Sequence, residues 1–67
     1  MIEVIVTFGE LEKIQYPEVY IQSKLRAAGI PITGFFTANN LVDLGKLKKE
    51  TFTDKKLIVY TWEENNG

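Results

Sequence analysis

The side chains of this chain that could do chemistry are carboxylates, lysines and a single serine. None of the 67 residues is a histidine or a cysteine, so the usual general base, the thiolate nucleophile and the nitrogen and sulfur ligands of metal ions are missing. Ser23, the one serine, falls on the polar side of a predicted helix and has no base to activate it. We therefore expect neither nucleophilic catalysis nor a metal site.

Carboxylate-only catalysis needs two acids held together in a cleft. The closely spaced acidic pairs are Glu10 with Glu12 and Glu63 with Glu64, which fall in a predicted connector and in a predicted polar tail. Acids in such segments are most simply explained as solvated charge. The glycines are too scattered for a phosphate-binding loop. The sequence therefore predicts no catalytic residue, no cofactor and no enzyme activity.

Two groups of side chains remain as candidates for an interaction site. Tyr60 and Trp62 alternate along a predicted last strand and so share one face of it, and Phe35 on a predicted second strand can stand beside them. The second group holds five of the eight basic residues: Lys46, Lys48, Lys49, Lys55 and Lys56. Core packing and a solvated surface are the plain explanations for these two groups. As functional groups, they would anchor a protein partner or bind single-stranded nucleic acid.

Hydrophobic patterning places these residues on a small set of elements. Alternating β-branched residues predict a first strand over 2–8. A helix is predicted over 17–28, because proline suits the first helical position and the Gly-Ile-Pro run at 29–31 stops the helix. Two further strands are predicted over 30–37 and 57–62.

Segment 38–56 is too long to be a structureless loop in so small a domain. A short helix capped by Asn40 is favoured there, with Gly45 inside it at a cost of about 1 kcal/mol. The competing interpretation is a short strand through 50–53 that turns into the last strand. From about residue 63 onward we expect a polar, frayed tail.

A strand, a helix and a second strand in this order imply a right-handed crossover with two parallel strands. The last strand then pairs beside them or between them, and the second arrangement is half of a ferredoxin-like fold. The predicted fold is a single small α+β domain over residues 1–67. Its sheet has three strands, or four if 50–53 pairs, and it has one long helix, in a β-α-β-(short α or β)-β order.

One long helix covers only one face of such a sheet. The other face would hold apolar residues from its strands: Ile5, Phe35 and either Leu57 with Val59 or Ile58 with Tyr60 and Trp62. Such a face is too apolar to stay bare. Either segment 40–50 or a second molecule is expected to cover it.

The end of the predicted helix and the start of the strand after it, Leu-Arg-Ala-Ala-Gly-Ile-Pro-Ile at 25–32, resemble the same junction in ACT regulatory domains and in small signal-transducing domains of ferredoxin-like fold. The resemblance implies a small-molecule sensor. The chain has no second long helix to complete those folds, so we assign no family and transfer no ligand residues.

Charge and hydropathy narrow the classes of partner. The formal net charge of −1 argues against strong attraction to nucleic acid or to an anionic membrane. No apolar run comes close to the roughly 18 residues of a membrane span. The chain has neither a signal-peptide pattern nor a cysteine, so a cytoplasmic location is expected.

The leading hypothesis is a non-enzymatic protein-interaction or regulatory and inhibitory accessory module. It would dock by a sheet edge or by the aromatic face, onto a second copy of itself or onto another protein. The alternative is a single-stranded nucleic-acid-binding protein that uses Tyr60, Trp62 and the lysines of 46–56, although Arg26 is its only arginine. A small-molecule sensor ranks third and an enzyme last.

Overall fold

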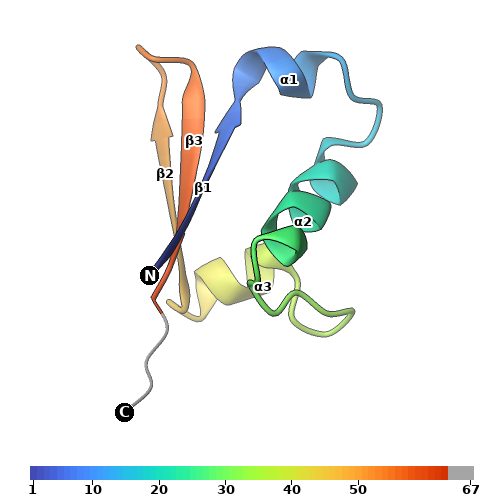
Figure 1. Cartoon of the computed structure of the whole chain (residues 1–67), viewed down its shortest axis with the longest axis vertical. Coiled ribbons are helices and arrows are strands. Elements are labelled where there is room, and N and C mark those ends of the chain that lie inside the picture. Colours follow the sequence, from blue (N-terminus) through green and yellow to red (C-terminus); the bar gives the residue numbers. More distant parts are fainter. Residues whose placement is uncertain (64–67) are drawn as a thin grey trace.

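The structure is a computed structural model that describes residues 1–63 (Figure 1). This part of the chain contains three strands and three helices. Their order is β1 (Ile2–Thr7), α1 (Phe8–Glu12), α2 (Pro17–Ala27), α3 (Ala38–Asp43), β2 (Leu47–Phe52) and β3 (Leu57–Trp62). The predicted α+β class and three-stranded sheet are confirmed. The predicted polar tail lies, beyond Glu63, outside the described residues.

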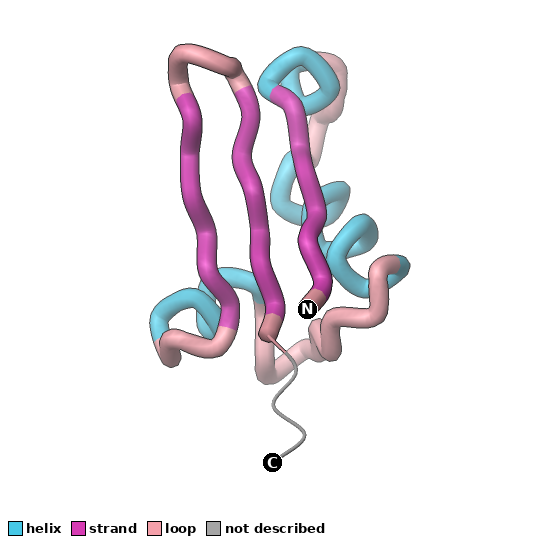
Figure 2. Tube along the Cα trace, turned by 60° about the vertical axis from the view of Figure 1, so that its left-hand side comes forward, coloured by secondary structure: helices cyan, strands magenta, loops and turns pink. Residues whose placement is uncertain are grey.

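The strands lie in the order β1-β3-β2, and both neighbouring pairs are antiparallel. β3 is therefore the central strand, and β1 and β2 run parallel to each other on either side of it. Figure 2 shows α2 and α3 on the same side of the sheet, behind the strands in that view. The sheet thus has one face that these helices cover and one that faces away from them.

The core lies between the sheet and the helices. Residues directly opposite each other in an antiparallel pair point to the same face. Three such pairs of β1 and β3 point towards the helices: Ile2 with Trp62, Val4 with Tyr60, and Val6 with Ile58. The remaining buried side chains come from the helices, the loops and the start of β2: Leu25, Ile30, Ile32, Ala38, Leu41 and Leu47.

α2 ends in a Schellman motif at Gly29, which has a φ of +102°. The N–H of Gly29 donates to the Arg26 carbonyl at 3.0 Å. The N–H of Ile30 donates to the Leu25 carbonyl, also at 3.0 Å, and both of these side chains are buried in the core. The prediction that Gly29 adopts a left-handed conformation after the helix is confirmed.

α3 ends in the same way at Gly45, which has a φ of +78°. The N–H groups of Gly45 and of the next residue donate to carbonyls near the end of this helix. At its start the Thr37 hydroxyl accepts a hydrogen bond from the N–H of Asn40 at 3.3 Å. Asn40 therefore lies inside the helix and Gly45 after it, both contrary to the prediction. Segment 38–56 contains a strand, β2, as well as the short helix, so the two competing interpretations both describe part of it.

Residues 30–37 form a loop and not the predicted second strand. The two isoleucines of this segment are buried in the core, which explains their alternation without a strand. The Thr33 hydroxyl then accepts hydrogen bonds from the N–H groups of Phe35 and Phe36, at 3.2 and 2.8 Å. This side chain turns the backbone where a strand would stay extended. The predicted second strand is therefore absent, and the predicted order of elements is not confirmed. The last strand, β3, lies between two parallel strands, but the second of these is β2 and not segment 30–37.

The helices of the described region are short. α2 has 11 residues, while α1 and α3 have five and six. Helices of this length are marginal in isolation, so they depend on their packing against the sheet. Within residues 1–63, no helix is both long enough and apolar enough to cross a membrane.

We expect Gly29→Ala to lower the free energy of unfolding by about 1 kcal/mol, because alanine resists the left-handed conformation. The added Cβ has room, since the nearest atom is Ile2 Cδ1 at 3.5 Å, so the cost is conformational. Urea unfolding followed by Trp62 fluorescence measures the change.

Gly34→Ala is the matched control for this substitution. Its φ lies outside the left-handed region, and a Cβ there would meet nothing within 4 Å. We expect a change of less than about 0.5 kcal/mol at this position. Equal losses at Gly29 and Gly34 would contradict the assigned motif.

Candidate functional site

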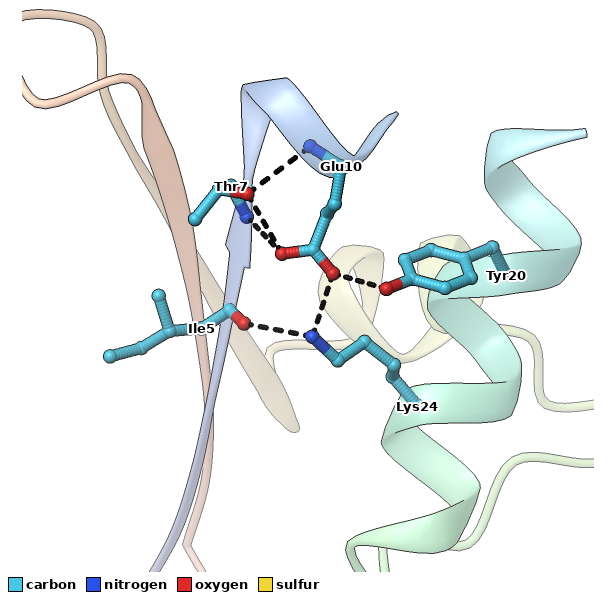
Figure 3. Close-up of polar contacts among 5 residues, drawn as sticks. All are labelled: Ile5, Thr7, Glu10, Tyr20 and Lys24. Carbon is cyan, nitrogen blue, oxygen red and sulfur yellow. Dashed lines mark hydrogen bonds and ion pairs between the residues drawn. The ribbon is translucent and has the colours of Figure 1, made fainter. Parts of the chain in front are cut away.

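Glu10 is the centre of a polar cluster that joins α1, α2 and β1 (Figure 3). Its Oε2 atom accepts hydrogen bonds from the backbone N–H and the hydroxyl of Thr7, at 2.8 and 2.9 Å. Its Oε1 atom accepts from the Tyr20 hydroxyl and pairs with Lys24 Nζ at 2.8 Å. Lys24 Nζ also donates to the Ile5 carbonyl oxygen at 3.3 Å. The cluster therefore ties α2 both to the start of α1 and to β1.

The local sequence explains how these groups meet. Thr7 caps α1, and its hydroxyl accepts from the N–H of Glu10 at 3.2 Å while the Glu10 carboxylate returns to the Thr7 N–H. This reciprocal pair is a capping box. Tyr20 and Lys24 are four residues apart and so share one face of α2. The sequence analysis placed Glu10 in a connector, which is wrong; the Thr-x-x-Glu spacing directly after a strand was the signal that it missed.

The cluster keeps Glu10 ionised. Its contacts, with Lys24 first, then Tyr20 and Thr7, lower the pKa of Glu10 from 4.5 to about 2. Hydrogen bonding to the same carboxylate raises the pKa of Tyr20 and the pKa of Lys24. A carboxylate that already accepts four hydrogen bonds and titrates this low is unsuited to proton transfer near neutral pH. The geometry makes it an anchor between elements.

Tyr60 and Trp62 share one face of β3, and that face packs against the helices. Tyr60 is 4% exposed and belongs to the core, and Trp62 is partly buried against it. Phe35 lies on the loop before α3 and is 88% exposed. The predicted aromatic surface is therefore divided between the core and a loop.

The five predicted lysines fall into two groups at opposite ends of β2. Lys46, Lys48 and Lys49 lie at its start, and Lys55 and Lys56 lie in the turn that joins it to β3. Six residues of strand span about 20 Å, so the two groups do not form a single basic patch.

A shallow depression at one end of the sheet brings Trp62 together with two of the lysines. Its lining consists of Gly45, Lys46, Leu47, Lys48, Thr61, Trp62 and Glu63. Lys48 Nζ is already paired with Glu50 at 2.8 Å, and Glu63 adds a negative charge to the lining. The charges in this depression are therefore balanced within the chain.

The face of the sheet directed away from α2 and α3, which we call the outer face, is made by the residues that alternate with the core positions (Figure 2). Its members are Glu3, Ile5 and Thr7 of β1, Leu57, Val59 and Thr61 of β3, and Lys48, Glu50 and Phe52 of β2. Ile5 lies opposite Val59, and Phe52 lies opposite Leu57. Ile5 is 48% exposed and the other three are partly exposed. Apolar side chains thus reach solvent in the middle row of this face and in the row next to the turn between β2 and β3.

Phe35 is a second exposed apolar group, and hydrogen bonds hold its loop. The Asn40 side-chain amide donates to the Phe35 carbonyl at 2.9 Å, and the Thr33 N–H donates to the Phe36 carbonyl at 3.0 Å. The aromatic side chain is therefore presented on an ordered turn.

Comparison of the chain with models of protein families, with curated proteins and with solved structures gave no match. The assignment of a site therefore rests on the chain's own geometry.

We expect Glu10→Gln to lower the stability at pH 7 and to abolish part of its pH dependence. The folded pKa of Glu10 is about 2, below the ordinary value of 4.5. Its stabilisation is therefore present above about pH 4.5 and is lost as the pH falls towards 2. Urea midpoints of the variant and the original chain should differ at pH 7 and converge near pH 2.

Glu12→Gln serves as the control, because Glu12 is an exposed carboxylate on the same short helix. A midpoint difference between the original chain and Glu10→Gln that stayed constant from pH 7 to pH 2 would show that the carboxylate does not anchor the helices.

Trp62→Ala should lower the free energy of unfolding by roughly 2 kcal/mol, less than the roughly 3–5 kcal/mol of a fully buried tryptophan, because Trp62 is only partly buried against the core. Phe35→Ala should change it by less than about 0.5 kcal/mol, since Phe35 is exposed. Thermal unfolding followed by circular dichroism compares the two. A larger loss from Phe35→Ala would contradict the placement of these aromatic residues.

Proposed function

We propose that this chain is a non-enzymatic protein-interaction module and that the outer face is its docking surface. The observation that carries the proposal is an apolar group on this face, formed by the exposed Ile5 and the partly exposed Val59, Leu57 and Phe52. An antiparallel sheet with one solvated face normally alternates apolar core residues with polar surface residues. On the central strand of this sheet the alternation fails, because Leu57 and Val59 point outward.

The position of these residues also supports docking. Val59 and Leu57 lie on the central strand, with neighbours on both sides, while the charged residues Glu3, Lys48 and Glu50 lie on the two edge strands. Charged residues thus border the apolar group at one end of the sheet and along β2. Apolar residues bordered by polar ones are the usual anatomy of a protein-protein interface.

We further infer that the sheet has a half-ferredoxin-like topology, with β3 inserted between two parallel strands. Sheets that carry their helices on one side leave the other side available to ligands, as RNA-recognition domains do. This general behaviour supports a binding role for the outer face without specifying the partner.

Binding of single-stranded nucleic acid has less support. Tyr60, one of the two strand aromatics proposed to stack on bases, is buried, and the lysines lie at opposite ends of β2. The net charge of −1 gives no general attraction to phosphate. We therefore propose that the chain acts as a regulatory or inhibitory accessory protein by docking onto another protein through the outer face.

The test places a photo-crosslinking residue on the outer face, next to Val59 of the central strand. Ile5→p-benzoylphenylalanine puts the probe at an exposed position of that face, and Tyr16→p-benzoylphenylalanine puts it at an exposed position before α2. We expect position 5 to give a discrete crosslinked product in a lysate of the producing organism, and position 16 to give none.

A substitution within the face provides the specificity control. Adding Val59→Arg should abolish the product from position 5, because it buries a charge at the centre of the interface. Adding Lys49→Glu, on the same sheet but on the helix side, should leave the product unchanged. Equal crosslinking from positions 5 and 16 would remove the basis for a docking role.

A further inference from the structure

We infer that a second site lies on the helix side of the sheet and binds a small zwitterion, a molecule such as glycine that carries one carboxylate and one ammonium group. The site is a depression of about 110 Å³ between α2, α3 and the strands β2 and β3, which we call the Tyr60 pocket. The outer face lies on the other side of the sheet. The inference therefore goes beyond the proposed docking role and does not depend on it.

The hydroxyl group of Tyr60 is the first observation. Tyr60 is 4% exposed, and within residues 1–63 its hydroxyl has no hydrogen-bond partner. No polar side-chain atom of the described residues is fully buried without a partner, so this hydroxyl opens into the pocket that Tyr60 lines. A nearly buried polar group without a partner favours a ligand that supplies one.

The hydroxyl is a hydrogen-bond donor for such a ligand. Burial raises the pKa of Tyr60, so the group stays protonated near neutral pH. A ligand carboxylate is a strong acceptor for this donor. The base of the pocket therefore suits a negatively charged oxygen.

Two charges of opposite sign line the same pocket. Lys49 lies directly opposite Tyr60 in the register of β2 with β3, so both side chains are on the helix side of the sheet. Glu18 comes from α2. Within residues 1–63 no ion pair joins Glu18 to Lys49, so their charged groups are more than 4 Å apart. A zwitterion between them can place its carboxylate at Lys49 and its ammonium group at Glu18.

The rest of the lining also favours a molecule with both charges. Gln22 shares one face of α2 with Glu18, and Asn39 lies on α3. Their amides can donate and accept hydrogen bonds. A simple anion would be repelled by Glu18, and a simple cation would be repelled by Lys49. A zwitterion meets neither penalty.

The volume of the pocket limits the size of the ligand. A cavity of about 150 Å³ holds benzene, so a pocket of about 110 Å³ holds roughly five or six non-hydrogen atoms. Glycine and alanine have this size. Glu18 and Lys49 are exposed to solvent, so we expect weak binding, with a dissociation constant on the order of 1 mM.

Titration with glycine, followed by amide NMR spectra of the isotope-labelled chain, tests the inference. The signals of the residues that line the pocket should shift and saturate, with a dissociation constant on the order of 1 mM. Acetate and methylammonium each carry only one of the two charges. Each should bind at least about tenfold more weakly than glycine.

Substitutions within the pocket should weaken glycine binding. Lys49→Gln and Glu18→Gln should each raise the dissociation constant about tenfold or more, and Tyr60→Phe about threefold or more, because each removes one contact. Lys48→Gln and Glu12→Gln are the matched controls. Both residues are exposed and lie outside the pocket, so the dissociation constant should stay unchanged. Circular dichroism verifies that each variant is folded.

Three results would overturn the inference. The first is the absence of any saturable shift with glycine up to about 50 mM. The second is acetate binding as tight as that of glycine, which would indicate a site for anions. The third is a glycine affinity that ignores both Tyr60→Phe and Lys49→Gln, which would place the binding elsewhere. Each of these results leaves the docking role intact, because crosslinking from position 5 tests that role separately.

Discussion

One-sided burial is the constraint on which the rest of this structure depends. The helices described within residues 1–63 are only five, 11 and six residues long. α2 and α3 lie on the same side of the three strands, and the core lies beneath them. The stability of the domain therefore comes from a single layer of buried side chains. The outer face is the face of the sheet that α2 and α3 do not cover.

Single-layer burial requires the chain to leave each helix and return to the core within a few residues. Gly29 and Gly45 meet this need, because each permits a left-handed residue directly after a helix. Ile30 then enters the core immediately after the first of them. Glu10 and Lys24 connect α1, α2 and β1 through charged hydrogen bonds. The polar cluster around Glu10 and the left-handed residues Gly29 and Gly45 thus both hold the helices against one face of the sheet.

Features of the fold that depend on local signals were predictable from the sequence, and those that depend on pairing were not. The left-handed Gly29 follows from its own neighbours, and so does the Thr7–Glu10 capping box, which the sequence analysis overlooked. Ile30 and Ile32 are both buried, so this loop has the alternating apolar pattern that is typical of a strand. The sequence analysis therefore predicted a strand there. The two faces of β3 are both apolar, and only its register with β1 and β2 decides that Tyr60 points inward. That register also decides which residues lie on the outer face. The sequence alone did not distinguish between the two faces of β3, so it could not predict the residues of the candidate site.

The exposure of the outer face is the central claim, and methyl relaxation by a soluble paramagnetic agent tests it most directly. In dilute solution the methyl groups of Ile5, Leu57 and Val59 should relax strongly, while those of Val6 and Leu25 in the core should not. Outer-face methyl groups that are as protected as Val6 in dilute solution would contradict the account.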